Sequence, residues 1–176
     1  LTGHASHQLG LDADIWLRPM PPQRLSRAER EEESSLTVVR ADRLDTDPAT
    51  WTPGHQAVLR SAAMDPQVQR IFVNAAIKRT LCRSAKGESW LRKIRPEHGH
   101  DYHFHVRLLC PPGADKCSPQ DPTPEGDGCD ATLEWWFTDE ALLPKPPAAP
   151  PPPLTLAKLP PQCRRVLEAP GLGARQ

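Results

Sequence analysis

The sequence has no excess of charge of either sign. Among its 176 residues, Lys and Arg together number 22, and so do Asp and Glu, so the formal net charge is zero. This balance argues against the basic footprint of a nucleic-acid-binding protein, and we expect no nucleic-acid partner. Long apolar runs are also missing. The uncharged apolar stretches fall far short of the ~18 residues that a membrane-spanning helix needs, so we expect no membrane insertion.

The start of the chain lacks the features of a targeting segment. It begins at Leu1, without a Met, a basic region or an apolar region behind it. We therefore expect an internal fragment or a processed product. A CxxC pair is missing as well, which leaves zinc-ribbon and thioredoxin-like readings without support.

Cysteine and proline are the residues in unusual supply. The chain has five cysteines, an odd number, all after residue 80 and mostly in irregular Pro- and Gly-rich sequence. This density favours disulfides in a secreted or periplasmic protein over unrelated buried thiols in a cytosolic one. Pro accounts for 22 residues, and nine of them fall in residues 144–161. That segment is typical of a polyproline II tail, so we expect a compact domain over residues 1–143 and a Pro-rich tail over 144–176.

Two segments alternate as half-buried strands do. Residues 11–17 place Asp12 and Asp14 on one face, opposite the apolar Leu11 and Leu17. Residues 102–109 form the clearest strand, with Phe104 and its apolar neighbours on one face. On the opposite face of that strand lie His103, His105 and Arg107.

The other elements complete an α+β chain. We expect helices over 53–64 and 75–82, with Asn74 able to cap the second, and a buried strand over 70–74. The aromatic cluster 134–137 is a plausible last strand, and His55 is expected on a helix surface. The pattern predicts a small, mostly antiparallel sheet with flanking helices.

The histidines are grouped in a way that indicates a metal. His4 and His7 lie near the start, and four more lie within residues 98–105. If the strands 11–17 and 102–109 pair or neighbour each other, a carboxylate and two imidazoles converge, and such ligands suit Zn²⁺. Three protein ligands leave a fourth position for water, which is typical of a catalytic site.

Four stretches carry a family resemblance. They are GHASHQLGLDADIWL, RIFVNAAIK, WLRKIRPEHGHDYHFHVRL and GDGC. The spacings His-x6-Asp and His-x-His resemble the metallopeptidase superfamily of lysostaphin-type enzymes, D-Ala-D-Ala peptidases and hedgehog-like domains. Together the stretches, over roughly residues 1–137, resemble the penicillin-insensitive murein endopeptidases of Gram-negative bacteria.

The resemblance implies a function and a set of site residues. Zinc ligands would be His7, Asp14 and His105, the catalytic histidine would be His103, and His100 would be a further active-site histidine. The implied reaction is hydrolysis of D-Ala–meso-diaminopimelate cross-links between peptidoglycan stem peptides, in the periplasm, by a zinc-activated water. The general base or oxyanion stabiliser would be His103.

A second metal is a further implication of the resemblance. Its ligands would be His4, Asp42 and Asp45, although turn carboxylates are the simpler reading of the two aspartates. Asp12 departs from the broader superfamily signature, and its carboxylate would orient an imidazole N–H. For Arg95 and Arg107, contact with a stem-peptide carboxylate and an ordinary surface position both remain open.

The resemblance also implies disulfides Cys82–Cys129 and Cys110–Cys117. Cys163 would pair with a cysteine upstream of Leu1, in an N-terminal third of the family domain that this chain lacks. Two other functions stay open. One is a D-Ala-D-Ala dipeptidase or carboxypeptidase with the same zinc ligands, and the other is a non-catalytic peptidoglycan-binding module.

Overall fold

The computed structural model describes residues 7, 10–114, 117–143, 155, 157 and 165. The described residues up to Leu143 form one compact unit, and the chain from Pro144 onward is grouped apart from it. The predicted limits 1–143 and 144–176 remain predictions, because most of the second range lies outside the described part. Within that part, no helix has the length and apolar character to cross a membrane.

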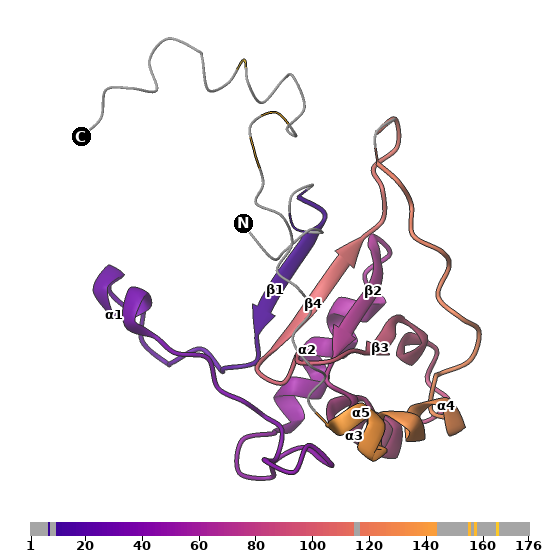
Figure 1. Cartoon of the computed structure of the whole chain (residues 1–176). Helices are drawn as coiled ribbons and strands as arrows, with labels where there is room; N and C mark the ends of the chain where they lie inside the picture. Colours follow the sequence, from indigo (N-terminus) through magenta and orange to yellow (C-terminus); the bar gives the residue numbers. More distant parts are fainter. Residues whose placement is uncertain are drawn as a thin grey trace. The chain divides into compact units, whose positions relative to one another are not determined.

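A four-stranded sheet is the centre of the unit, in the order β1-β4-β2-β3. Its strands are β1 (Asp12–Trp16), β2 (Val68–Val73), β3 (Ile94–Pro96) and β4 (His103–Leu108). Figure 1 shows β4 between β1 and β2, and it pairs antiparallel with both, whereas β2 and β3 are parallel. The predicted α+β fold with a small, mostly antiparallel sheet is confirmed.

The two faces of the sheet differ in chemistry, as the alternation in the sequence predicts. One face carries Ile71, Ile94 and Phe104, which are at most 1% exposed and belong to the hydrophobic core. The other face carries Asp14 of β1 opposite His105 of β4, which in turn lies opposite Phe72 of β2. Metal-ligating residue types from distant segments therefore meet on a single surface.

Two helices cover the core face. They are α2 (Pro53–Met64), which begins with Pro at its first turn, and α3 (Ala75–Ala85), whose N-cap Asn74 accepts a hydrogen bond from Ala76 N. Between α3 and β3 lies the short 3₁₀ helix η2 (Ser89–Lys93). An outlying helix, α1 (Arg27–Glu32), begins with a capping box between Ser26 and Glu29.

The expected surface position of His55 is wrong. Its side chain is buried, and its Nε2 lies 2.7 Å from the carbonyl oxygen of Leu17. On the other side of the ring, Nδ1 accepts a hydrogen bond from Thr52 N at 3.0 Å, and the ring stacks on Trp51. Both ring nitrogens have partners, so a buried imidazole is tolerated here as a structural bridge between α2 and the end of β1.

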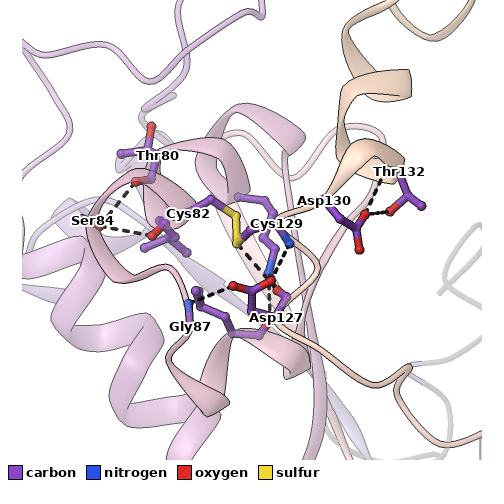
Figure 2. Close-up of a disulfide and its surroundings, with 11 residues drawn as sticks. Thr80, Cys82, Ser84, Gly87, Asp127, Cys129, Asp130 and Thr132 are labelled. Atoms are coloured by element: carbon purple, nitrogen blue, oxygen red, sulfur yellow. Dashed lines mark hydrogen bonds between the residues drawn. A yellow bond between two sulfur atoms is a disulfide. The ribbon is translucent and has the colours of Figure 1, made fainter.

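The segment after residue 126 is fixed to α3. The predicted disulfide Cys82–Cys129 joins the two, and Cys110–Cys117 closes a shorter loop. Figure 2 shows the first disulfide beside the carboxylate of Asp127, which accepts hydrogen bonds from Gly87 N and Cys129 N. The remaining predicted disulfide partner, Cys163, lies outside the described residues.

The expected strand over residues 134–137 is wrong, because this region is helical. It contains α4 (Ala131–Glu134), the 3₁₀ helix η3 (Trp135–Phe137) and α5 (Asp139–Leu142). The carboxylate of Asp130 accepts from Thr132 N and starts α4. Arg79 of α3 pairs with Glu134 and lies over the ring of Phe137, so these contacts hold the aromatics against a helix.

Candidate metal centre

Three side chains from distant parts of the sequence meet on the polar face of the sheet. His7 Nε2 lies 3.2 Å from His105 Nδ1 and 3.4 Å from Asp14 Oδ1. The third edge of this triangle, from His105 Nδ1 to Asp14 Oδ1, measures 3.1 Å. Among the described residues, this is the group of His, Cys, Asp and Glu side chains with the spacing to hold a metal ion.

The triangle has the size of one face of a zinc tetrahedron. Zn²⁺ binds His nitrogen and carboxylate oxygen at about 2.0–2.1 Å, which places neighbouring ligand atoms of a tetrahedron about 3.3 Å apart. The three edges here lie between 3.1 and 3.4 Å. Two imidazoles and one carboxylate also match the donor types that zinc prefers. The residues present therefore fit a tetrahedral ion with one position left open.

Strand register explains how Asp14 and His105 meet. They are direct partners in the antiparallel β1–β4 ladder, so their side chains stand side by side on the same face. His7 enters from the segment that precedes β1. The side chains of His7 and His105 are only 14% and 12% exposed, whereas that of Asp14 is 28% exposed.

Asp12 and Arg107 hold the His105 ring in position from behind. His105 Nε2 lies 2.8 Å from Asp12 Oδ1, and Asp12 Oδ2 accepts a hydrogen bond from Arg107 Nη1. The Asp12 side chain is only 1% exposed. With its Nε2–H donated to Asp12, His105 presents the lone pair of Nδ1 to the triangle. The predicted orienting role of Asp12 agrees with this contact, and Arg107 is part of the support, not a surface cation.

His103 lies one side-chain alternation from His105 and borders the triangle. Its Nε2 is 3.7 Å from Asp14 Oδ1, and its side chain is 12% exposed. Burial lowers the pKa of His103, against the opposing effect of the Asp14 carboxylate. Its Nδ1 is buried and has no hydrogen-bond partner among the described residues. A neutral, incompletely partnered imidazole at this position is suited to accept a proton.

His100 reaches the site from the loop before β4. Its ring lies 4.8 Å from that of His103 and 6.0 Å from that of His105. The residue has a left-handed backbone, with φ of 54°, a conformation that is uncommon for residues other than glycine but that His adopts more often than most. Asn74 holds the loop in this shape, because its backbone N donates to His100 O and its side chain donates to Gly99 O.

The sequence did not single out Phe72 as a neighbour of the site, whereas it did name Arg95. Phe72 packs edge-on against His105, with ring centroids 5.6 Å apart, and so forms an apolar wall. It was recognised only as part of a buried strand, and its partnership with His105 depends on the β2–β4 register. Arg95 lies next to Phe72 on β3, where burial and the nearby Arg70 lower its pKa.

The second set of candidate ligands is not gathered in the described part of the structure. Asp42 pairs with Arg40, and Asp45 pairs with Arg83 at 2.6 Å and also accepts a hydrogen bond from Thr46 N. The third candidate, His4, lies outside the described residues. A second metal at His4, Asp42 and Asp45 therefore remains a prediction.

Comparison with known proteins adds independent information. The family model described as penicillin-insensitive murein endopeptidase matches residues 1–168. A protein of that name from Haemophilus influenzae is 46% identical over 171 residues, which cover 97% of this chain and 58% of the relative. Proteins of the same name from Yersinia enterocolitica and Klebsiella pneumoniae are 45% and 44% identical, and this chain covers 59% of each. The chain thus spans somewhat less than three fifths of these relatives.

Proposed function

The chain belongs to the penicillin-insensitive murein endopeptidase family, and from this premise we propose that it hydrolyses peptide cross-links in peptidoglycan with a bound zinc ion. The proposed substrate is the D-Ala–meso-diaminopimelate bond between two stem peptides. The proposed metal ligands are His7, Asp14 and His105. Because the substrate is cell-wall material, we propose the periplasm as its location.

The observation that carries the proposal is the triangle of His7 Nε2, Asp14 Oδ1 and His105 Nδ1, with edges of 3.1–3.4 Å. Three protein ligands with an open fourth position are typical of catalytic zinc sites, whereas structural sites use four. When bound, Zn²⁺ supplies a Lewis acid for the scissile carbonyl and lowers the pKa of a water molecule to about 7.

The remaining roles fall to side chains around the triangle. We assign His103 as the general base, because burial lowers its pKa and so favours the neutral imidazole, and because its Nε2 lies 3.7 Å from the Asp14 carboxylate of the triangle. In a second step it would return the proton to the leaving amine. His100, whose ring lies against His103, would donate to the developing oxyanion or steady His103. The ring of Phe72 packs edge-on against His105 and would keep water from the side of the imidazole that it covers.

The proposal is tested with purified cross-linked muropeptide dimers and zinc-loaded protein. We expect conversion of dimers to monomers, its loss on chelation and its return when zinc is added back. Asp14→Ala should lose both zinc and activity. The matched control is Asp121→Ala, which removes an exposed carboxylate that has no part in the triangle and should leave both intact.

Product identity separates the alternatives. Release of free D-Ala without dimer cleavage would assign a carboxypeptidase with the same zinc ligands. Zinc and peptidoglycan binding without turnover would assign a binding module. Dimer cleavage that persists in Asp14→Ala without bound zinc would overturn the metal mechanism.

A further inference from the structure

A polar cavity of about 240 Å³ lies in the same compact unit as the metal centre. Its wall includes the loop 97–101, which also carries His100 toward His103 and His105. Glu97, His98, Gly99 and Asp101 line the cavity, while the ring of His100 contacts the metal-side histidines. One rigid loop therefore borders both the candidate metal centre and this cavity.

The cavity presents charges of both signs. Arg40 and Arg43 contribute from the turn that follows Val39, and Glu97 and Asp101 contribute from the loop before β4. Arg40 pairs with Asp42, and Asp101 accepts a hydrogen bond from Thr37 Oγ1. The guanidinium of Arg43, in contrast, has no hydrogen bond or ion pair with any described residue. The cavity thus offers an uncommitted cation together with carboxylates.

Arg43 occupies a backbone position that normally favours glycine. Its φ is 59°, in the left-handed region, within a turn that closes when Arg43 N donates to Arg40 O at 2.9 Å. Glycine would adopt this conformation without strain. Backbone strain of this kind concentrates at functional sites, and here the residue that bears it places its side chain at the cavity.

An aromatic surface completes the lining. His98 and Trp136 have ring centroids 4.8 Å apart, and both face the cavity. Such a pair suits a short hydrocarbon chain that connects charged groups. The combination suits a ligand with an anion, a cation and a few methylene groups.

We propose that this cavity binds the free amino-acid end of diaminopimelate in the stem peptide that donates the scissile D-Ala carbonyl. The inference rests on the proposed function and adds a subsite to it. Diaminopimelate has two amino-acid ends joined by three methylene groups, and only one end belongs to the peptide chain of the donor stem. The free carboxylate pairs with Arg43, the free ammonium pairs with Glu97, and the methylene groups pass along His98 and Trp136.

The fixed loop explains why the subsite and the reaction belong together. Asn74 lines the cavity and binds both Gly99 O and His100 O at 2.9 Å. When the cavity on one side of the loop binds the diaminopimelate side chain of the substrate, the D-Ala that follows it is positioned on the other side of the loop. The diaminopimelate residue directly precedes the D-Ala whose carbonyl is attacked, so the subsite and the metal centre would bind neighbouring residues of the substrate.

The test is direct binding of a ligand that the enzyme does not cleave. The probes are the tripeptide L-Ala-γ-D-Glu-meso-diaminopimelate and the same tripeptide with its free side-chain carboxylate amidated. Calorimetry on the full chain should give at least about tenfold tighter binding of the acid form, since a hydrogen-bonded charge pair is lost in the amide. Arg43→Gly should abolish that preference. Because glycine suits the left-handed backbone, the variant should fold at least as stably as the natural chain.

Two comparisons make the result decisive. Arg24→Gly removes an exposed arginine outside the cavity and should keep the preference. Glu97→Gln should weaken binding of the acid tripeptide, but not of a version whose free ammonium is acetylated. Equal affinity of the natural chain for acid and amide, or a preference that survives in Arg43→Gly, would overturn the subsite. Because the tripeptide carries no D-Ala, this outcome is independent of cross-link cleavage, whose absence would instead overturn the proposed function.

Discussion

Asp12 and His105 lie on neighbouring strands, and Asp12 Oδ1 is 2.8 Å from His105 Nε2. The opposite nitrogen of the same ring, Nδ1, lies 3.1 Å from Asp14 Oδ1. A single carboxylate therefore determines which nitrogen of His105 is available to a metal. Arg107 in turn holds Asp12, so a chain of contacts runs from the proposed ion through His105 and Asp12 to Arg107.

This relationship predicts the effect of Asp12→Asn. The variant should bind zinc about 10–100-fold more weakly, because the hydrogen bond that fixes the His105 tautomer loses its charged acceptor. Competition titration with a chromogenic chelator measures the change. Asp121→Asn, an exposed replacement of the same kind, is the control and should bind zinc normally. Unchanged zinc affinity in Asp12→Asn would show that Asp12 does not orient the ligand.

The position of His103 predicts a separation of catalysis from metal binding. His103→Gln should lower kcat by about 10²–10⁴-fold, the range expected for loss of a general base. Zinc content, measured on the same sample by atomic emission, should remain the same, since His103 is not part of the ligand triangle. A variant that lost its zinc along with its activity would reassign His103 as a ligand.

Lys78 predicts a pH dependence of stability. Its side chain is completely buried, and Nζ donates to the backbone carbonyls of Leu91 and Asp127. Burial lowers the pKa of Lys78 to about 8, with a further lowering by Arg95 and opposing effects of Asp127 and Asp130. Between that value and the ordinary 10.5, the unfolded chain binds more protons than the folded one. The contribution of Lys78 to stability should therefore rise with pH across this window.

The test compares urea unfolding at pH 7 and pH 9.5. Relative to Lys78→Met, the natural chain should gain on the order of 1–3 kcal/mol at the higher pH. Lys86→Met, at an exposed position, is the control and should show no comparable gain. A difference between natural chain and Lys78→Met that is the same at both pH values would refute the lowered pKa.

The two disulfides predict an order of stabilisation. Cys82–Cys129 spans 47 residues of sequence, whereas Cys110–Cys117 spans 7. From loop-closure entropy, removal of the first should cost about 4 kcal/mol and removal of the second about 2 kcal/mol. Paired Cys→Ala replacements and denaturant unfolding measure both. The reverse order would mean that Cys82–Cys129, the disulfide drawn in Figure 2, restricts the unfolded chain only a little.

Local pattern was sufficient for the elements that carry the site. The alternation in residues 102–109 predicted that His103 and His105 share a face, and β4 has this arrangement. The same reasoning placed Asp12 and Asp14 together on β1. A helix over 53–64 followed from its Pro start and its apolar spacing, and α2 has these limits. Strand and helix periodicities are properties of neighbouring residues, so the sequence displays them directly.

Features that depend on partners far away in the sequence could not be predicted from local pattern. The burial of His55 depends on the carbonyl of Leu17, 38 residues away, and the helical state of residues 134–137 depends on contacts with Arg79 of α3. The buried Lys78 is satisfied by carbonyls from two separate segments, Leu91 of η2 and Asp127 of the loop before α4. No local pattern records such partners, because burial of a polar group is decided by what another segment supplies.

The sequence by itself determined which residue types could hold a metal and which of them share a strand face. The tertiary structure decided that Asp14 pairs with His105, that Asp12 takes the opposite ring nitrogen, and that a charged cavity adjoins the loop of His100. The reason is that spacing along one strand fixes only a direction for each side chain. Distances of about 3 Å between segments some ninety residues apart are fixed by sheet register and by the packing of the core behind it.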